Sequence, residues 1–172
     1  VLELARRSLC EHVVVQPEAA GIVFGGGFPR RPTPAGRRAA QRVIWHAERQ
    51  LEWLHQQERH AAVVLCDRGT LDGLAYWPGP PDEFLAEMGT DAAAELARYD
   101  AVIHLRTPER DHGYNHANPL RIEDARAARE IDDRIIELWS AHPARTMIDE
   151  QVDFAVKAQQ ALAAVAALTL GA

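Results

Sequence analysis

The chain has few cysteines, no long apolar run and no excess of basic charge, and each of these excludes a class of protein. Its two cysteines, Cys10 and Cys66, lie far apart and lack CxxC spacing, so they offer neither a disulfide framework nor a zinc site. The formal net charge of -6 argues against a general nucleic-acid binder, because a duplex would be repelled on average. Residues 161–172 are apolar but too few and too rich in alanine to span a bilayer.

What remains is the composition of an ordinary globular protein. The 172 residues are 47% hydrophobic and 26% charged, which predicts a single compact domain over residues 1–172 with a sizeable core. Cys66 is interpreted as a small core residue, and no signal peptide is recognised at the start of the chain. We therefore expect a cytoplasmic protein.

The most informative stretch is residues 61–66, an apolar run rich in valine that ends abruptly at Asp67 and Arg68. It predicts a strand buried on both faces, with Asp67 at the carboxyl edge of a sheet, where open parallel α/β folds bind their ligands. An apolar strand ending in Asp is the Walker B pattern, in which the carboxylate holds a hydrated magnesium ion beside the phosphates of a nucleotide. Asp also simply starts turns after many buried strands, and this second interpretation stays open beside the first.

Strand and helix patterns alternate along the chain and predict an α/β fold with a parallel sheet. Residues 13–15 form a short strand, and Pro17 and a second acid, Glu18, follow it. The helix predicted over 38–57 is expected to bury a stripe made of Ala40, Val43, Ile44, Ala47, Leu51 and Leu54. Further strands are expected over 100–105 and 145–149, and further helices over 1–9, 83–98 with an interruption at Gly89, 121–141 and 151–170.

Residues 21–37 are predicted to form a loop, because the glycines at 25–27 are followed by several prolines. The triple glycine lacks the Lys-Ser/Thr of the GxxxxGK[ST] phosphate loop, so a flexible or substrate-covering loop is the better interpretation. Four arginines gather just before a helix, where the helix dipole disfavours cations: Arg30, Arg31, Arg37 and Arg38. They indicate either a solvated basic loop or a site for an anionic partner such as a phosphoinositide or an acidic protein.

Other polar and aromatic features have both a structural and a functional interpretation. His112 and His116 are spaced as metal ligands can be, but without an evident third ligand a mobile loop over 109–119 is favoured. The helix over 121–141 interleaves arginines with acids, which is usual for a solvated face held by i,i+3 and i,i+4 pairs. Three aromatic side chains could stack on a nucleotide base: Phe28, Tyr76 and Trp77. Aromatic side chains beside a strand end are more often part of the hydrophobic core.

The order of these pieces resembles a P-loop NTPase of the AAA-like group that includes the ribosylnicotinamide kinase domain of NadR-type proteins. The deoxynucleoside and thymidylate kinases are more distantly similar. The resemblance spans nearly the whole chain. It is carried by Pro17-Glu18-Ala19-Ala20, Cys66-Asp67-Arg68-Gly69, the run from Leu71 to Tyr76, Tyr99-Asp100, Leu105-Arg106-Thr107-Pro108, Gly113-Tyr114-Asn115, and residues 118–124 with Ala128, Arg129 and Asp132.

The resemblance implies an ATP-binding protein that uses Mg²⁺ to hydrolyse ATP or to phosphorylate a small nucleoside-like acceptor. Glu18 would be a general base or a ligand of a magnesium-bound water, and Asp67 would share the magnesium. Arg68 would touch substrate or phosphate. A LID-like segment over about 109–130 would close over the transferring phosphoryl group with Arg121, Arg126 and Arg129.

The chain departs from this family at its start. Family members begin with a strand and a Gly-rich loop ending in Gly-Lys-Ser/Thr, and a helix follows. The helix predicted over residues 1–9 corresponds to that helix, so the strand and the loop before it are absent from this sequence. The absent strand is the middle one in the family, between those at 61–66 and 101–105. We therefore expect either a truncated, inactive fragment of a longer ATP-dependent protein or a degenerate, noncatalytic domain whose sheet has repaired itself. A noncatalytic module that binds an anionic partner through Arg30, Arg31, Arg37 and Arg38 is the alternative function.

Overall fold

The computed structural model describes residues 1–9, 13–58, 61–106, 125–149 and 154–170. Helices and strands alternate through these residues, as the sequence predicts for an α/β protein. In chain order they are α1 (Leu2–Ser8), β1 (Val13–Gln16), α2 (Ala19–Gly25), α3 (Pro34–Glu58), β2 (Val63–Cys66), the 3₁₀ helix η1 (Thr70–Ala75), α4 (Pro81–Glu87), α5 (Ala92–Leu96), β3 (Val102–Leu105), α6 (Ala125–Leu138), β4 (Arg145–Ile148) and α7 (Phe154–Leu170).

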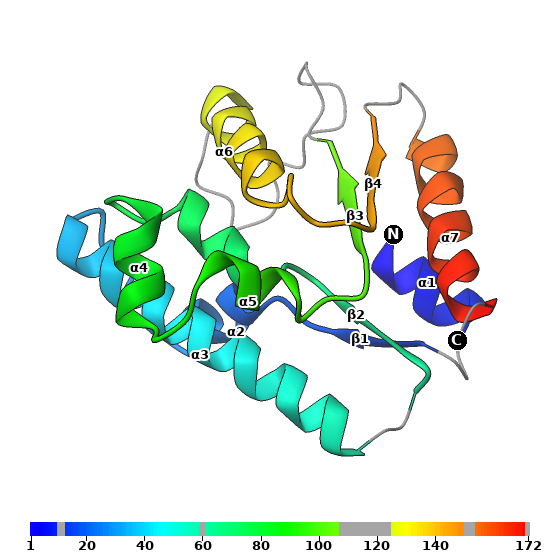
Figure 1. The fold of residues 1–172 in the computed structure, drawn as a ribbon, viewed down its shortest axis with the longest axis horizontal. Coiled ribbons are helices and arrows are strands. Elements are labelled where there is room, and N and C mark those ends of the chain that lie inside the picture. Colours follow the sequence, from blue (N-terminus) through cyan, green and yellow to red (C-terminus); the bar gives the residue numbers. More distant parts are fainter. Residues whose placement is uncertain (10–12, 59–60, 107–124, 150–153, 171–172) are drawn as a thin grey trace.

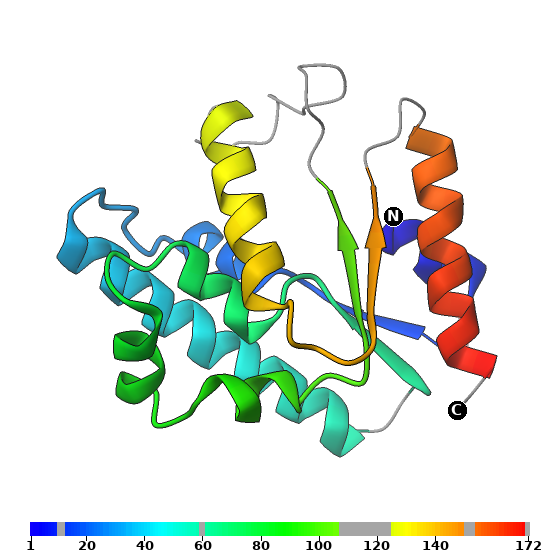
Figure 2. The same ribbon diagram turned by 45° about the horizontal axis from the view of Figure 1, so that its top comes forward.

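The strands form two separate parallel pairs. β1 pairs with β2 in a register that joins Val13 to Val63, and β3 pairs with β4 in a register that joins Val102 to Arg145. The two pairs run in clearly different directions in both views of the molecule (Figures 1 and 2). Parallel pairing across α2 and α3 confirms the expected strand, helix, strand order, because parallel neighbours need a crossover connection.

β2 is less buried than its sequence predicts. Its residues, from Val63 to Cys66, are all only partly buried, so the expectation of a strand buried on both faces is wrong. The reason is its position: within the described residues β2 has β1 as a neighbour on one side only. An apolar sequence allows a strand to be buried, but the elements packed beside the strand determine how much of it is buried.

The main hydrophobic core lies around η1 rather than around the strands. α3, α5 and α6 all contact η1, which is buried along almost its whole length. α4 joins α3 through ion pairs of Arg38 with Glu83 and of Arg42 with Glu87. The buried cluster consists of Trp45, Leu71, Leu74, Ala75, Trp77, Phe84, Leu85, Ile135 and Trp139.

The buried face of α3 differs from the predicted one. Val43 and Leu54, predicted to be buried, are 38% and 42% exposed, whereas Glu48 and Glu52 are buried. Glu52 accepts hydrogen bonds from the hydroxyl of Tyr99 and the guanidinium of Arg98. A carboxylate can be buried when such donors surround it, and hydrophobic periodicity cannot reveal donors that lie more than forty residues away.

The predicted loop over 21–37 is partly helical. α2 continues to Gly25 and packs on α3, which itself begins at Pro34 rather than at residue 38. Proline is favoured in the first turn of a helix, where its missing N–H costs nothing. The glycine content did mark the end of α2, since Gly27 adopts a left-handed φ of 93°.

The predicted interruption at Gly89 is confirmed. α4 ends at Glu87, α5 begins at Ala92, and Gly89 has a left-handed φ of 68° that glycine adopts without a steric penalty. The buried side of α6 is only partly as expected. Ile135 is buried and Ile131 partly buried against the core, but Asp132, predicted on the solvated face, is 6% exposed, with its Oδ1 2.9 Å from Nε2 of His104. The expected loop with His112 and His116 lies outside the described residues, as does the start of the helix predicted from residue 121.

α1 and α7 lie side by side, next to β4 and away from η1 (Figure 1). α7 is apolar around most of its circumference, but no helix in the described part of the chain is long and apolar enough to cross a membrane.

Candidate functional site

The carboxyl ends of β1 and β2 bring two of the predicted acids to one end of the sheet. The parallel register joins Gln16 to Cys66, so Glu18 and Asp67 both follow the same edge. The backbone N–H of Asp67 donates to the carbonyl oxygen of Gln16 over 3.0 Å, which ties the two strand ends together. Glu18 is the N-cap residue of α2.

Arg68 lies between these strand ends and η1. Its Nε is 3.9 Å from Glu18 Oε1, and its Nη1 is 3.5 Å from Asp72 Oδ2. The φ of Arg68 is 87°, in the left-handed region, and no other non-glycine residue in the described ranges has a positive φ. Such a conformation costs a side-chain-bearing residue about 1–2 kcal/mol and persists only where its surroundings hold it. The Arg68 side chain is 43% exposed, so part of its guanidinium remains open to a ligand.

Asp72 joins this site to the core. Its Oδ1 accepts a hydrogen bond of 2.6 Å from the indole N–H of Trp139, and both residues are buried. Burial raises the pKa of Asp72, while the charge of Arg68 and the Trp139 hydrogen bond oppose that rise. The Trp139 ring also covers Gly69, where a Cβ atom would lie 2.5 Å from Cζ2 of the indole. Glycine at this position is therefore required by close packing.

Glu48 adds a buried acid behind the site. Burial raises the pKa of Glu48 well above its usual value, and the negative charges of Asp72 and Glu52 raise it further. Its Oε1 atom has no hydrogen-bond partner among the described residues. The positive charge of Arg68 lowers the pKa of Glu48 and so acts in the opposite direction.

The structure describes two of the three arginines predicted to belong to the LID-like segment. Arg126 is exposed in the first turn of α6 and pairs with Glu130 over 3.1 Å. Arg129 is half-buried on the same helix, and Arg121 lies outside the described residues. The pairing of Arg126 with Glu130 is the i,i+4 contact that the structural interpretation of this helix expects.

Most of the arginines proposed to bind an anionic partner have partners within the chain. Arg37 donates to the carbonyl oxygen of Tyr76 over 2.6 Å, and Arg38 pairs with Glu83 over 2.7 Å. The guanidinium of Arg30 lies 4.2 Å from the centre of the Phe24 ring. Arg31 is exposed.

The described residues contain no cluster of three metal ligands, and Trp77 is not available to stack a base. No group of three or more histidine, cysteine, aspartate or glutamate side chains suited to a metal ion occurs in the described residues. Trp77 is 4% exposed and packs edge-on against Phe84, with ring centres 4.9 Å apart. It belongs to the core, as the structural interpretation predicts.

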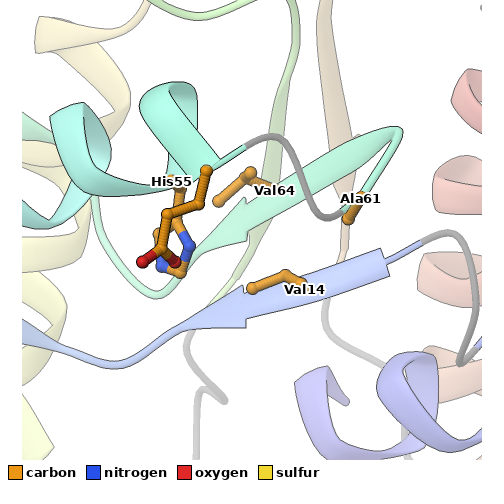
Figure 3. Close-up of a pocket in the computed structure, with 5 residues that line it drawn as sticks. Val14, His55, Ala61 and Val64 are labelled. Atoms are coloured by element: carbon orange, nitrogen blue, oxygen red, sulfur yellow. The ribbon is translucent and has the colours of Figure 1, made fainter.

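A small pocket of about 110 Å³ lies elsewhere on the β1–β2 pair. Figure 3 labels four of the residues that line it: His55 from α3, Val14 from β1, Val64 from β2, and Ala61 just before β2. Val14 and Val64 are paired in the middle of the strands, so the pocket is set back from the strand ends that Glu18 and Asp67 follow. The sequence analysis did not identify this pocket.

A comparison with family models assigns the chain to a family. A model of the AAA domain family matches residues 1–157. The chain belongs to the AAA domain family. As a member of the AAA domain family it is a P-loop NTPase-like protein, and the family implies ATP binding. Comparisons with curated proteins and with solved structures gave no match.

The sequence analysis missed the contribution of Asp72, Trp139 and Glu48 to the site. Asp72 stood within the motif from Leu71 to Tyr76, but without a role. No sequence motif marks Trp139 or Glu48 as part of the site, because each acts on it through residues that are far away in the sequence.

Proposed function

We propose that the protein is an ATP-binding P-loop NTPase that transfers the terminal phosphoryl group of ATP to water or to a small acceptor at the carboxyl ends of β1 and β2. The observation that supports this most is the gathering of Glu18, Asp67 and Arg68 at one sheet edge in a member of the AAA domain family. Phosphoryl transfer requires positioning and charge stabilisation, and such a group can supply both.

Each of these residues has a distinct role in the proposal. Asp67 holds Mg²⁺, and Glu18 either binds a magnesium-coordinated water or acts as the general base toward the acceptor hydroxyl. Arg68 contacts substrate or phosphate. Arg121, Arg126 and Arg129 belong to the LID-like segment that closes over the phosphoryl group.

The donor set fits magnesium. Mg²⁺ keeps several of its waters and is held by one or two carboxylates together with substrate phosphates, so a cluster of three protein ligands is not needed. Glu18 and Asp67 are two carboxylates at the same sheet edge. When bound, the ion would neutralise charge on the phosphate oxygens.

We also propose that a further strand carrying the Gly-Lys-Ser/Thr phosphate loop lies between β2 and β3 in the complete domain. Within the described residues β2 pairs only with β1 and β3 only with β4, so each has one edge without a strand partner. A degenerate domain with a repaired sheet would be expected to pair β2 with β3.

The test is magnesium-dependent ATP binding, measured by calorimetry on the protein expressed from its complete gene. Asp67→Asn should weaken binding by roughly tenfold or more. Asp82→Asn is the matched control, because Asp82 is exposed in the first turn of α4. Absence of magnesium-dependent ATP binding by the complete protein would refute the proposal.

A further inference from the structure

The carboxylate of Asp72 divides its two oxygens between donors from different parts of the fold. Oδ1 accepts the indole N–H of Trp139 over 2.6 Å, and Oδ2 lies 3.5 Å from Arg68 Nη1. The bond to Trp139 is short, whereas the contact with Arg68 is long. The hydrogen bond from Trp139 therefore sets the orientation of the Asp72 carboxylate, and its second oxygen, Oδ2, faces Arg68.

Arg68 depends on such support. Its φ of 87° is unfavourable for a residue with a side chain, and its long side chain loses rotamer entropy when it is held in one place. Its Nε lies 3.9 Å from Glu18 Oε1, the limit of an ion pair, whereas Asp72 is nearer, with 3.5 Å between Nη1 and Oδ2. Asp72 therefore makes the shorter of the two ion pairs that the side chain of Arg68 forms with these acids.

Trp139 is itself firmly placed. It is 3% exposed, its ring meets that of Tyr99 edge-on with centres 5.1 Å apart, and its indole covers Gly69. It directly follows α6, the helix that also carries Arg126 and Arg129. A shift of α6 would therefore move the indole away from Asp72.

We infer that Asp72 and Trp139 are positioning residues that hold the guanidinium of Arg68 beside Glu18, so that the placement of Arg68 depends on the packing of α6 against η1. The inference deepens the proposed function and rests on it where Arg68 is taken to contact the nucleotide or acceptor. Asp72 and Trp139 act through Arg68 and contact neither ligand.

The first experiment follows Arg68 directly, in the complete protein without nucleotide. The Nε–H signal of Arg68 is assigned in ¹H–¹⁵N spectra by its loss in Arg68→Lys, and its exchange with solvent is measured. Asp72→Asn and Trp139→Phe should each speed that exchange by roughly tenfold, because each removes one link of the chain of contacts. Asp82→Asn and Trp53→Phe are the controls, since Asp82 is exposed and Trp53 is 55% exposed.

The second experiment is a double-mutant cycle on the affinity for Mg·ATP. Arg68→Ala and Asp72→Asn should each weaken binding, and the double variant should bind no more weakly than Arg68→Ala alone. A purely structural role of Asp72 predicts losses that add. If Asp72→Asn does not fold, Trp139→Phe replaces it in the same cycle.

The outcomes separate the inference from the proposed function. Wild-type protein that fails to bind Mg·ATP refutes the function, and the exchange measurement then decides the positioning by itself. Unchanged Arg68 exchange in both Asp72→Asn and Trp139→Phe overturns the inference, as do additive losses or an Arg68→Ala variant with wild-type affinity.

Discussion

The indole N–H of Trp139 donates to the carboxylate of Asp72 over 2.6 Å, although 67 residues separate the two in the chain. This bond connects the residue after α6 to η1, which follows the turn that carries Asp67 and Arg68. The candidate site and the hydrophobic core therefore share a residue, because Trp139 is also a member of the core cluster. Changes in the core near Trp139 should reach the site.

Replacing Gly69 tests the contact beneath the site. Gly69→Ala should lower the free energy of unfolding by about 1–3 kcal/mol, because the new Cβ would overlap the Trp139 ring. Gly25→Ala is the control, since beyond its own helix no atom of the described residues lies within 4 Å of a Cβ at that position. Urea denaturation measures both, and equal midpoints for the two variants would contradict the packing described for Trp139.

Glu48 predicts a pH dependence of stability. Its raised pKa means that the folded protein binds a proton that the unfolded chain releases once the pH exceeds the ordinary carboxyl value. Stability should therefore fall as the pH rises from about 4.5 through the higher folded-state pKa of Glu48. Glu48→Gln removes this titration, so the variant should gain stability relative to wild type as the pH rises. Unfolding free energies measured from about pH 5 to 8 that run parallel for the two proteins would show that Glu48 is not the buried acid described here.

Replacing a buried and an exposed phenylalanine by alanine tests where the hydrophobic core lies. Phe84 is fully buried against Trp77, so Phe84→Ala should cost about 3–5 kcal/mol of unfolding free energy. Phe154 is 63% exposed at the start of α7, and Phe154→Ala should change stability by no more than about 0.5 kcal/mol. Thermal and urea unfolding provide the comparison. Similar losses in both variants would place the core elsewhere than around η1.

Cys66 should be chemically unreactive in the folded protein. Burial raises the pKa of its thiol to about 12, and the thiolate is the form that reacts with alkylating agents. In a Cys10→Ser background, iodoacetamide at about pH 8 should modify Cys66 at least roughly tenfold more slowly in native protein than in urea. Mass spectrometry follows the reaction, and equal rates in the two conditions would contradict the raised pKa of the partly buried Cys66 thiol.

Part of the fold could be predicted from the sequence because its signals are local. Valine-rich runs mark β1 and β2, Gly89 marks the break between α4 and α5, and parallel pairing follows from the helices that separate the strands. That pairing alone brings Glu18 and Asp67 to one edge, since the carboxyl ends of parallel strands coincide. Family motifs extend this to the AAA domain, which the comparison confirms.

Only the tertiary structure decided the rest, because the remaining features depend on contacts between distant residues. Whether Glu52 or Leu54 faces inward depends on donors supplied by other elements, which the periodicity of α3 does not contain. The support of Arg68 depends likewise on an indole that α6 brings to Asp72. A local pattern states what a residue can do, but its burial and partners depend on which surfaces the whole chain packs together.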